Sequence, residues 1–162
     1  DVKVVVNIQA DEPLVRPAMI NALASQLLEN KKLVMATLIK KIKDEKDIHD
    51  PNVVKVVLDK DGFAIYFSRA PIPYNREHTQ GAFLTASHYK HIGIYGYTKD
   101  FLFTFSNMPQ SKLELIEKLE QLRVVEAGYK IKTIETTYET KSVDTNQDLE
   151  EVKKMLGVDR KI

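Results

Sequence analysis

The chain has 162 residues, 24 basic against 23 acidic side chains, a formal net charge of +1 and no cysteine. This length suits one domain with a substantial core, and the balanced charge argues against a nucleic acid as the main partner. Without cysteine there is no disulfide framework or thiolate metal site, and no apolar run approaches the ~20 residues that span a bilayer. We therefore expect a single domain over residues 1–162, without a membrane segment and in the cytoplasm.

The first forty residues have the order strand, helix, strand. Residues 4–8 form a continuous apolar run, which is typical of a strand buried on both faces of a parallel sheet. Pro17 suits a first helical turn, Leu23 and Leu27 recur at helical spacing, and residues 33–39 form a second apolar run. This order predicts an α/β fold with a mostly parallel sheet, whose ligands gather outside the carboxyl ends of the strands.

The following stretch alternates connections and strands. We expect residues 40–50 to be a solvated connection and residues 53–58 and 63–67 to form a hairpin, because an Asp-Gly pair separates them. Residues 71–87 carry two prolines, a glycine and little periodicity, which predicts a long loop of the kind that is commonly functional. Residues 89–97 return to strand character.

The last third predicts two helices around one strand. Ser111 and Glu114 form a capping box before a helix with Leu115, Leu119 and Leu122 on one face. Residues 131–137 are expected to form the last strand, and a terminal helix is expected to start near Thr145.

Two carboxylates follow predicted strands and could hold a metal ion. Asp11 follows the first strand, and Asp144 lies between the last strand and the last helix. At the carboxyl edge of a sheet, such groups suit Mg²⁺ beside a phosphate. Both also have a plain alternative as residues that cap a helix or begin a turn.

Five further residues could bind a polar ligand. Arg69 emerges from a strand into the long loop, where its guanidinium could grip a carboxylate, although a surface arginine is the common alternative. His91 and Tyr95 are four residues apart on a strand and therefore share a face, where a packed histidine is the common alternative. Glu120 and Gln121 lie on an amphipathic helix, where they could simply face solvent. From these residues alone the chain is an α/β domain with an anion or nucleotide site at one sheet edge.

Several strings in this order resemble the 3-deoxy-manno-octulosonate (Kdo) cytidylyltransferases over essentially the whole chain. The strings are Asn7-Ile8-Gln9-Ala10-Asp11-Glu12-Pro13, Pro51-Asn52-Val53-Val54-Lys55-Val56-Val57, Tyr66-Phe67-Ser68-Arg69-Ala70-Pro71-Ile72-Pro73-Tyr74, Lys90-His91-Ile92-Gly93-Ile94-Tyr95 and Leu119-Glu120-Gln121-Leu122-Arg123, with Val143-Asp144-Thr145 near the end. The Ser-Arg-x-Pro-Ile-Pro and Lys-His-Ile-Gly-Ile-Tyr pair favours Kdo over the sialic acid branch.

The resemblance implies a Rossmann-like nucleotidyltransferase that transfers CMP from CTP to Kdo with Mg²⁺ as cofactor, releasing diphosphate, for lipopolysaccharide biosynthesis. Carried over by motif, Asp11 and Asp144 would be catalytic residues that hold the metal. The acid-sugar pocket would be formed by Gln9, Arg69, His91, Tyr95, Glu120 and Gln121. A homodimer is also implied, with its contact around residues 63–97. Lys55 lies in a matching string, but the resemblance gives it no role.

The chain departs from the family in two places. Position 10 is alanine where the family usually has glycine. The family's amino-terminal strand, its basic triphosphate loop and its cytosine-recognising segment have no counterpart, so we expect a domain incomplete at its amino terminus. These 162 residues alone would bind CTP poorly and be inactive. The alternatives are a cytidylyltransferase for another acid sugar and a noncatalytic dimerisation or sugar-binding fragment.

Overall fold

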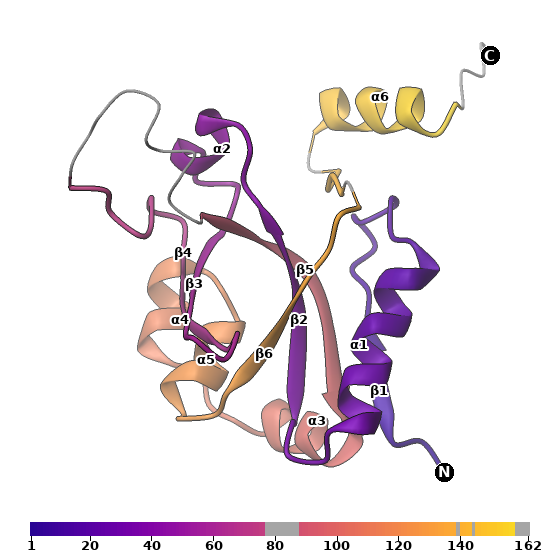
Figure 1. Ribbon diagram of the computed structural model, residues 1–162, viewed down its shortest axis with the longest axis vertical. Helices are drawn as coiled ribbons and strands as arrows, with labels where there is room; N and C mark the ends of the chain where they lie inside the picture. Colours follow the sequence, from indigo (N-terminus) through magenta and orange to yellow (C-terminus); the bar gives the residue numbers. More distant parts are fainter. Residues whose placement is uncertain (77–87, 139, 144, 158–162) are drawn as a thin grey trace.

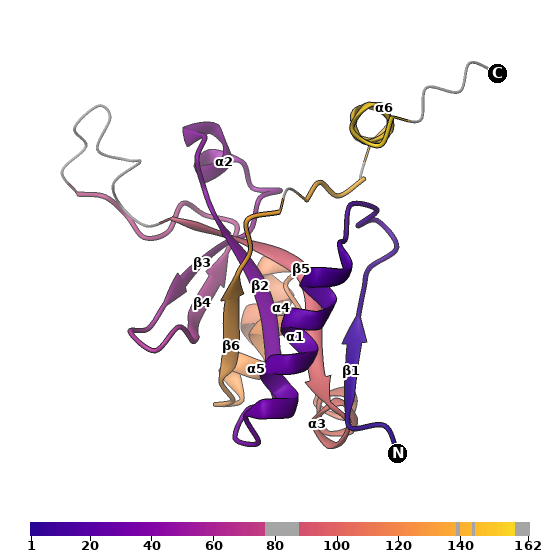
Figure 2. The same ribbon diagram turned by 45° about the vertical axis from the view of Figure 1, so that its right-hand side comes forward.

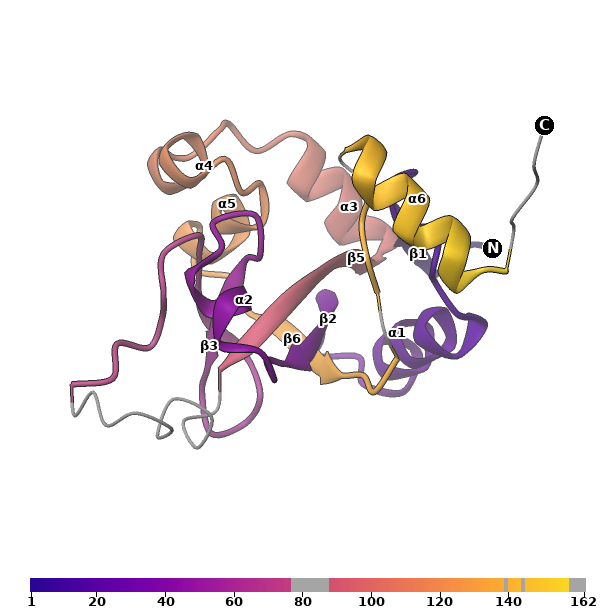
Figure 3. The ribbon, with the colours of Figure 1, turned by 90° about the horizontal axis from the view of Figure 1, so that it is seen from above.

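The computed structural model describes residues 1–76, 88–138, 140–143 and 145–157. They form three layers, with a six-stranded sheet between helix α1 on one face and helices α3, α4 and α5 on the other (Figures 1 and 3). The strands are β1 (Val4–Asn7), β2 (Met35–Lys41), β3 (Lys55–Leu58), β4 (Ala64–Ser68), β5 (Tyr89–Thr98) and β6 (Ile131–Glu135). The helices are α1 (Pro17–Glu29), α2 (Glu45–His49), α3 (Lys99–Ser106), α4 (Lys112–Glu117), α5 (Gln121–Glu126) and α6 (Asn146–Met155). The expected α/β class is confirmed.

The sheet is mixed, which corrects the expectation of a mostly parallel one. Its strand order is β4-β3-β5-β2-β6, with β1 also paired to β5. Among the described strands, only β2 and β6 pair in parallel, because β5 runs opposite to each of its neighbours β1, β2 and β3. Apolar patterning reports burial and carries no information on strand direction. The carboxyl ends of β1, β2 and β6 nevertheless point the same way, and β5 begins at that edge.

Helix α1 covers one face of the sheet, as Figure 2 shows. Pro17 occupies its first turn, as predicted, and Met19, Leu23 and Leu27 are its buried side chains. They pack on a core cluster that includes Leu38 of β2 and Ile92 and Ile94 of β5. At Gly96 of β5 a Cβ atom would lie 2.8 Å from Leu27 Cδ1, so glycine permits this close approach of helix and strand.

The opposite face is covered by α3, α4 and α5. The Ser111–Glu114 capping box is confirmed, but the single predicted helix is two short ones, because Lys118 takes a left-handed conformation with φ of 56°. Leu119 and Leu122 are buried as expected, whereas Leu115 is exposed. Helix α3 was not predicted. Its N-cap is Thr98, whose hydroxyl accepts a hydrogen bond from the Phe101 backbone N–H.

The remaining predicted segments agree in part. The hairpin of β3 and β4 is confirmed, and its turn is stabilised by Asp59, whose Oδ1 accepts from the backbone N–H groups of Asp61 and Phe63. Residues 40–50 are not simply solvated, because they contain α2 and because Lys40 is buried and donates to the carbonyls of Thr137 and Tyr138 at 3.0 Å. Residues 77–87 of the predicted long loop lie outside the described residues.

The terminal helix is confirmed as α6. Thr145 is its N-cap and forms a capping box with Asp148. The segment between β6 and α6 crosses the edge of the sheet at which β1 and β2 end (Figure 1). None of the helices within the described ranges has the length and apolar character needed to cross a bilayer.

Candidate functional site

A cavity of about 880 Å³ opens at the sheet edge where β1, β2 and β6 end and β5 begins. Its walls come from the loop after β1, residues 50–54 before β3, the first half of β5, the junction of α4 and α5, and the segment before α6. Seven of the eight predicted site residues line it, namely Gln9, Asp11, Arg69, His91, Tyr95, Glu120 and Gln121. The eighth, Asp144, lies outside the described residues. The structure thus gathers in one cavity residues that lie up to 112 positions apart, from Gln9 to Gln121.

The cavity exists because two strands meet β5 at separate places along the same edge. The last residue of β1, Asn7, pairs with Tyr95, whereas the first residue of β3, Lys55, pairs with Lys90. The β5 residues between these positions therefore face a gap instead of a neighbouring strand. Gly93 lies in this gap, where a Cβ atom would be only 3.1 Å from Gln9 Oε1. The absence of a side chain at Gly93 leaves room for the Gln9 carboxamide.

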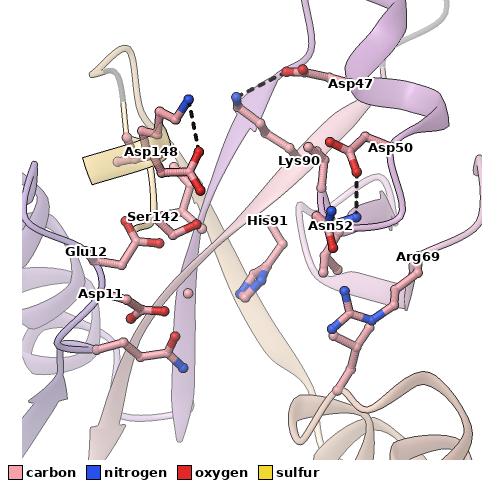
Figure 4. Close-up of a pocket in the computed structure, with 18 of the residues that line it drawn as sticks. Asp11, Glu12, Asp47, Asp50, Asn52, Arg69, Lys90, His91, Ser142 and Asp148 are labelled. Carbon is pink, nitrogen blue, oxygen red and sulfur yellow. Dashed lines mark hydrogen bonds and ion pairs between the residues drawn. The ribbon is translucent and has the colours of Figure 1, made fainter. Parts of the chain in front are cut away.

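One wall carries Asp11, which is half-buried. The backbone N–H of Val143 donates to the carbonyl oxygen of Asp11 at 2.9 Å, so the segment before α6 is tied to the loop after β1. Ser142 and Asp148 lie on the same side of the cavity as Asp11 in Figure 4. Asp148 pairs with Lys141 at 3.2 Å. These contacts hold Val143 and Ser142 beside the loop that carries Asp11.

The opposite wall carries Arg69 (Figure 4). Its Nε donates to the carbonyl of Glu117 and its Nη1 to the carbonyl of Pro51, both at 2.9 Å. Carbonyl groups orient the guanidinium but do not neutralise it, and no ion pair involves Arg69 within the described residues. Arg69 is therefore a fixed cation with donor capacity left for an anion in the cavity.

Lys55 stabilises the loop before β3, which forms part of this wall. It is fully buried, and its Nζ donates to the carbonyls of Asp50 at 2.7 Å and Val53 at 2.5 Å. Burial lowers the pKa of its ammonium group. Because Pro51, which accepts from Arg69, lies within the loop that Lys55 holds, the lysine supports the arginine indirectly. Its signal in the sequence is a lysine inside an apolar strand.

The floor of the cavity is formed by His91 and Tyr95, which share a face as predicted. Their ring centroids are 5.2 Å apart, and the edge of Phe67 packs against His91 at the same distance. Burial lowers the pKa of His91 to about 3 and raises the pKa of the Tyr95 phenol. Both side chains are therefore neutral near pH 7 and can exchange hydrogen bonds with a ligand.

Gln121 contributes a buried amide at the first position of α5. The residue is 2% exposed, and its Nε2 has no hydrogen-bond partner among the described residues. The alternative of a solvated helix face is therefore wrong for Gln121, because the break at Lys118 turns it inward. Glu120 is exposed, as that alternative expected, but lines the same cavity. A buried amide donor without a partner is costly, so it marks a place where a ligand oxygen fits.

No cluster of three or more His, Cys, Asp or Glu side chains able to hold a metal is found in the described ranges. Mg²⁺ is commonly held by one or two carboxylates together with substrate phosphates. The oxygen of a half-buried carboxylate such as that of Asp11 fits this requirement.

Comparisons with known proteins agree with this arrangement. The family model for cytidylyltransferases matches residues 1–134. The chain is 47% identical over 153 residues to the 3-deoxy-manno-octulosonate cytidylyltransferase of Solibacter usitatus, covering 94% of this chain and 59% of the relative. It is 52% identical over 148 residues to the protein of the same name from Fusobacterium nucleatum, covering 91% of this chain and 58% of the relative. The chain thus spans about three fifths of these curated relatives.

Solved structures resemble the whole described fold. A CMP:2-keto-3-deoxy-manno-octonic acid synthetase complexed with CTP superimposes with a TM-score of 0.85 at 38% identity, over 96% of this chain and 62% of that one. A 4-diphosphocytidyl-2C-methyl-D-erythritol synthase from Anaerococcus prevotii, at 13% identity and a TM-score of 0.54, covers 96% of this chain and 59% of its own and shares the fold alone. The Rossmann-like nucleotidyltransferase fold is confirmed. The chain belongs to the cytidylyltransferase family, and its resemblance to the 3-deoxy-manno-octulosonate cytidylyltransferases is confirmed.

Proposed function

We propose that the chain is the sugar-binding part of an enzyme that transfers CMP from CTP to Kdo and releases diphosphate, for lipopolysaccharide biosynthesis. The observation that carries this proposal is the presence of two groups with unused hydrogen-bond donors in the lining of one cavity. Arg69 is a positioned cation without an ion-pair partner in the described residues, and Gln121 is a buried amide with an unused donor there. A ligand that carries both a carboxylate and several hydroxyl groups satisfies both.

The chemistry of an acid sugar fits the remaining groups of the cavity. The Arg69 guanidinium can bind a carboxylate with two parallel hydrogen bonds, whereas His91 and Tyr95 are neutral and suit hydroxyl groups. The Gln9 carboxamide, which lies next to Gly93, offers a donor and an acceptor. Together these groups hold the sugar in one orientation, and orientation is the main protein contribution to a phosphoryl-group transfer.

In the transfer, the anomeric hydroxyl oxygen of Kdo forms a bond to the α-phosphorus of CTP. The bond from that phosphorus to the oxygen of the β-phosphate breaks, the hydroxyl proton passes to water, and diphosphate leaves. Asp11 and Asp144 would hold Mg²⁺, which neutralises charge on the triphosphate when bound. The hydrogen bond from the Val143 backbone N–H to the Asp11 carbonyl supports this assignment, since it ties the described segment before α6 to the loop of Asp11.

The first test is Kdo binding to the 162-residue chain, measured by calorimetry. Replacing Arg69 with methionine should weaken binding by about tenfold or more, because a charge-assisted hydrogen-bond pair is lost. Arg16 is exposed and lies outside the cavity, so Arg16→Met is the matched control and should bind as the wild type does. Equal affinities of the Arg69→Met and wild-type chains would refute the proposed sugar pocket.

The second test is diphosphate release with CTP, Mg²⁺ and Kdo, with Asp11→Asn as the comparison variant. Release that requires Kdo and is lost in Asp11→Asn would establish the transferase and show that the chain needs no further segment. Kdo binding without release would support the role of this chain as the sugar-binding part alone. An acid sugar other than Kdo that binds more tightly would favour the alternative substrate.

We also propose a homodimer in the cytoplasm, with the contact around residues 63–97. Ile65 of the outer strand β4 and Tyr74 are large apolar side chains, 55% and 74% exposed, within the described part of this stretch. Such side chains on an edge strand suit a contact with a second copy. Sedimentation of the wild type and of an Ile65→Lys, Tyr74→Lys double variant tests this, and a monomeric wild type would refute it.

A further inference from the structure

Thr37 is a fully buried hydroxyl at the centre of the sheet. It pairs with Tyr95 of β5, and directly after it the register shifts so that Leu38 pairs with Ile92. Gly93 and Ile94 therefore have no partner on β2, and β5 bulges next to Thr37. The bulge brings three polar atoms to the Thr37 hydroxyl.

The three atoms around Thr37 Oγ1 are the carbonyl oxygen of Ile94 at 2.9 Å, the carbonyl oxygen of Ile92 at 3.3 Å and Nε2 of His91 at 3.0 Å. A threonine hydroxyl has one hydrogen, and carbonyl oxygens only accept. If that hydrogen pointed to His91, two oxygens would face each other at 2.9 Å with no hydrogen between them. The hydrogen therefore goes to a carbonyl, chiefly that of Ile94, and the hydroxyl oxygen accepts a hydrogen bond from His91.

These hydrogen bonds determine the tautomer of the His91 imidazole. A neutral histidine carries its single N–H on one ring nitrogen, and here that nitrogen is Nε2. The other nitrogen, Nδ1, then has a free lone pair. Thr37 is the only hydrogen-bond partner of the His91 side chain within the described residues, and the ring lines the cavity between Phe67 and Tyr95.

We propose that Thr37 is a positioning residue that holds His91 in the Nε2–H tautomer, so that Nδ1 accepts a hydrogen bond from a sugar hydroxyl in the cavity. The identity of the ligand rests on the function proposed above, whereas the tautomer does not. An ionised carboxylate has no hydrogen to donate, so Nδ1 of His91 binds a hydroxyl group of the sugar. The carboxylate of the sugar is then bound by Arg69. The two residues thus divide the recognition of an acid sugar between them.

The tautomer can be observed directly by NMR of the ¹⁵N-labelled chain, because protonated and unprotonated ring nitrogens have separate ¹⁵N shifts. The chain has four histidines, so the His91 signals are assigned as those lost in His91→Gln. The wild type and Thr37→Ser should show protonated Nε2 and unprotonated Nδ1. In Thr37→Val, which has the same shape without the hydroxyl, this preference should be lost.

The same variants test the consequence for binding. Kdo affinity should fall about three- to tenfold in Thr37→Val, the loss expected for one hydrogen bond, and be retained in Thr37→Ser. A wild type with protonated Nδ1, or a folded Thr37→Val with the wild-type tautomer, would overturn the inference. If Thr37→Val does not fold, the tautomer observed in the wild type alone supports or overturns the inference. A wild type with the expected tautomer but no affinity for Kdo would refute the proposed function and leave the role of Thr37 standing.

Discussion

Substitutions at two glycines of β5 should affect different properties. Gly96→Ala should lower the stability of the fold, and Gly93→Ala should change the geometry of the site. At Gly96 a new Cβ atom would lie 2.8 Å from Leu27 Cδ1 and 3.4 Å from Leu23 Cβ. The first distance is about 1 Å shorter than a normal carbon–carbon contact. Leu23 and Leu27 are 0% and 3% exposed, so neither side chain can move into open space. Gly96→Ala should therefore force α1 away from the sheet.

The expected cost follows from these contacts. Overpacking a core costs about 1–3 kcal/mol, and the loss of glycine freedom in the unfolded chain returns about 0.4–1 kcal/mol. The middle values of the two ranges give a net loss of unfolding free energy for Gly96→Ala of about 1.3 kcal/mol, or roughly 3–5 °C in Tm for a chain of this size. Urea and thermal denaturation measure both quantities. A variant as stable as the wild type would refute the argument that Gly96 is required by close packing.

Gly93→Ala is the matched control, three residues earlier on the same strand. Its new Cβ atom would meet Gln9 Oε1 at 3.1 Å, at the end of a side chain that can move. Its unfolding free energy should stay within about 1 kcal/mol of the wild type. Kdo affinity should fall instead, because Gln9 is displaced. If Gly93→Ala and Gly96→Ala changed the unfolding free energy and the Kdo affinity equally, the distinct roles assigned to the two glycines would be wrong.

Three further predictions concern buried polar groups. Glu114→Gln should destabilise the chain by about 2–4 kcal/mol in urea denaturation, because it breaks a buried ion pair. The Glu114 carboxylate accepts hydrogen bonds from Arg123 Nε at 2.8 Å and from Arg123 Nη2 at 2.5 Å. The control Glu150→Gln removes one partner of an exposed ion pair and should have no measurable effect. The pKa of His91 is about 3 in the folded chain and 6.5 ordinarily, so the unfolded chain gains a proton first as the pH falls. The free energy of unfolding that His91 contributes should therefore be fully present above pH 6.5 and be lost as the pH drops toward 3. The decrease over this range, measured by urea denaturation, should be smaller in His91→Gln. Lys55→Met should weaken Kdo binding about three- to tenfold in calorimetry without removing a group from the cavity, because two carbonyls of the loop that orients Arg69 lose their donor.

The strands and most helices could be predicted because their signals are local. Apolar runs placed β1, β2 and β5 to within a few residues, and the capping box at Ser111 placed the start of α4. The start of α6 was expected near Thr145 and lies at Asn146. The direction of β5 could not be predicted, because the same apolar run fits a strand of either direction. Helix α3 had a local signal that was missed, namely Thr98 as a cap followed by Phe101 and Phe105 on one face.

The residues of the candidate site were named from motifs, whereas the contacts that support them could not be predicted. Gln9, Arg69 and His91 stand in strings that the resemblance identified, and the structure brings them to one cavity. Lys55 and Thr37 act through other residues, by bonds to carbonyls and to an imidazole that only the folded chain brings close. Nothing in the sequence near Thr37 shows that β5 bulges beside it.

The position of β5 also decides how the site can be lost. This strand pairs with β1, β2 and β3, so its bonds join residues about 35 to 95 positions apart, as between Lys55 and Lys90 or between Val4 and Thr98. Bonds of such long range form together with the sheet and break together with it. The amide hydrogens of β5 should therefore exchange with solvent by global unfolding rather than by local opening. A destabilising substitution far from the cavity would lower the fraction of molecules with an intact site but leave the affinity of each intact molecule unchanged.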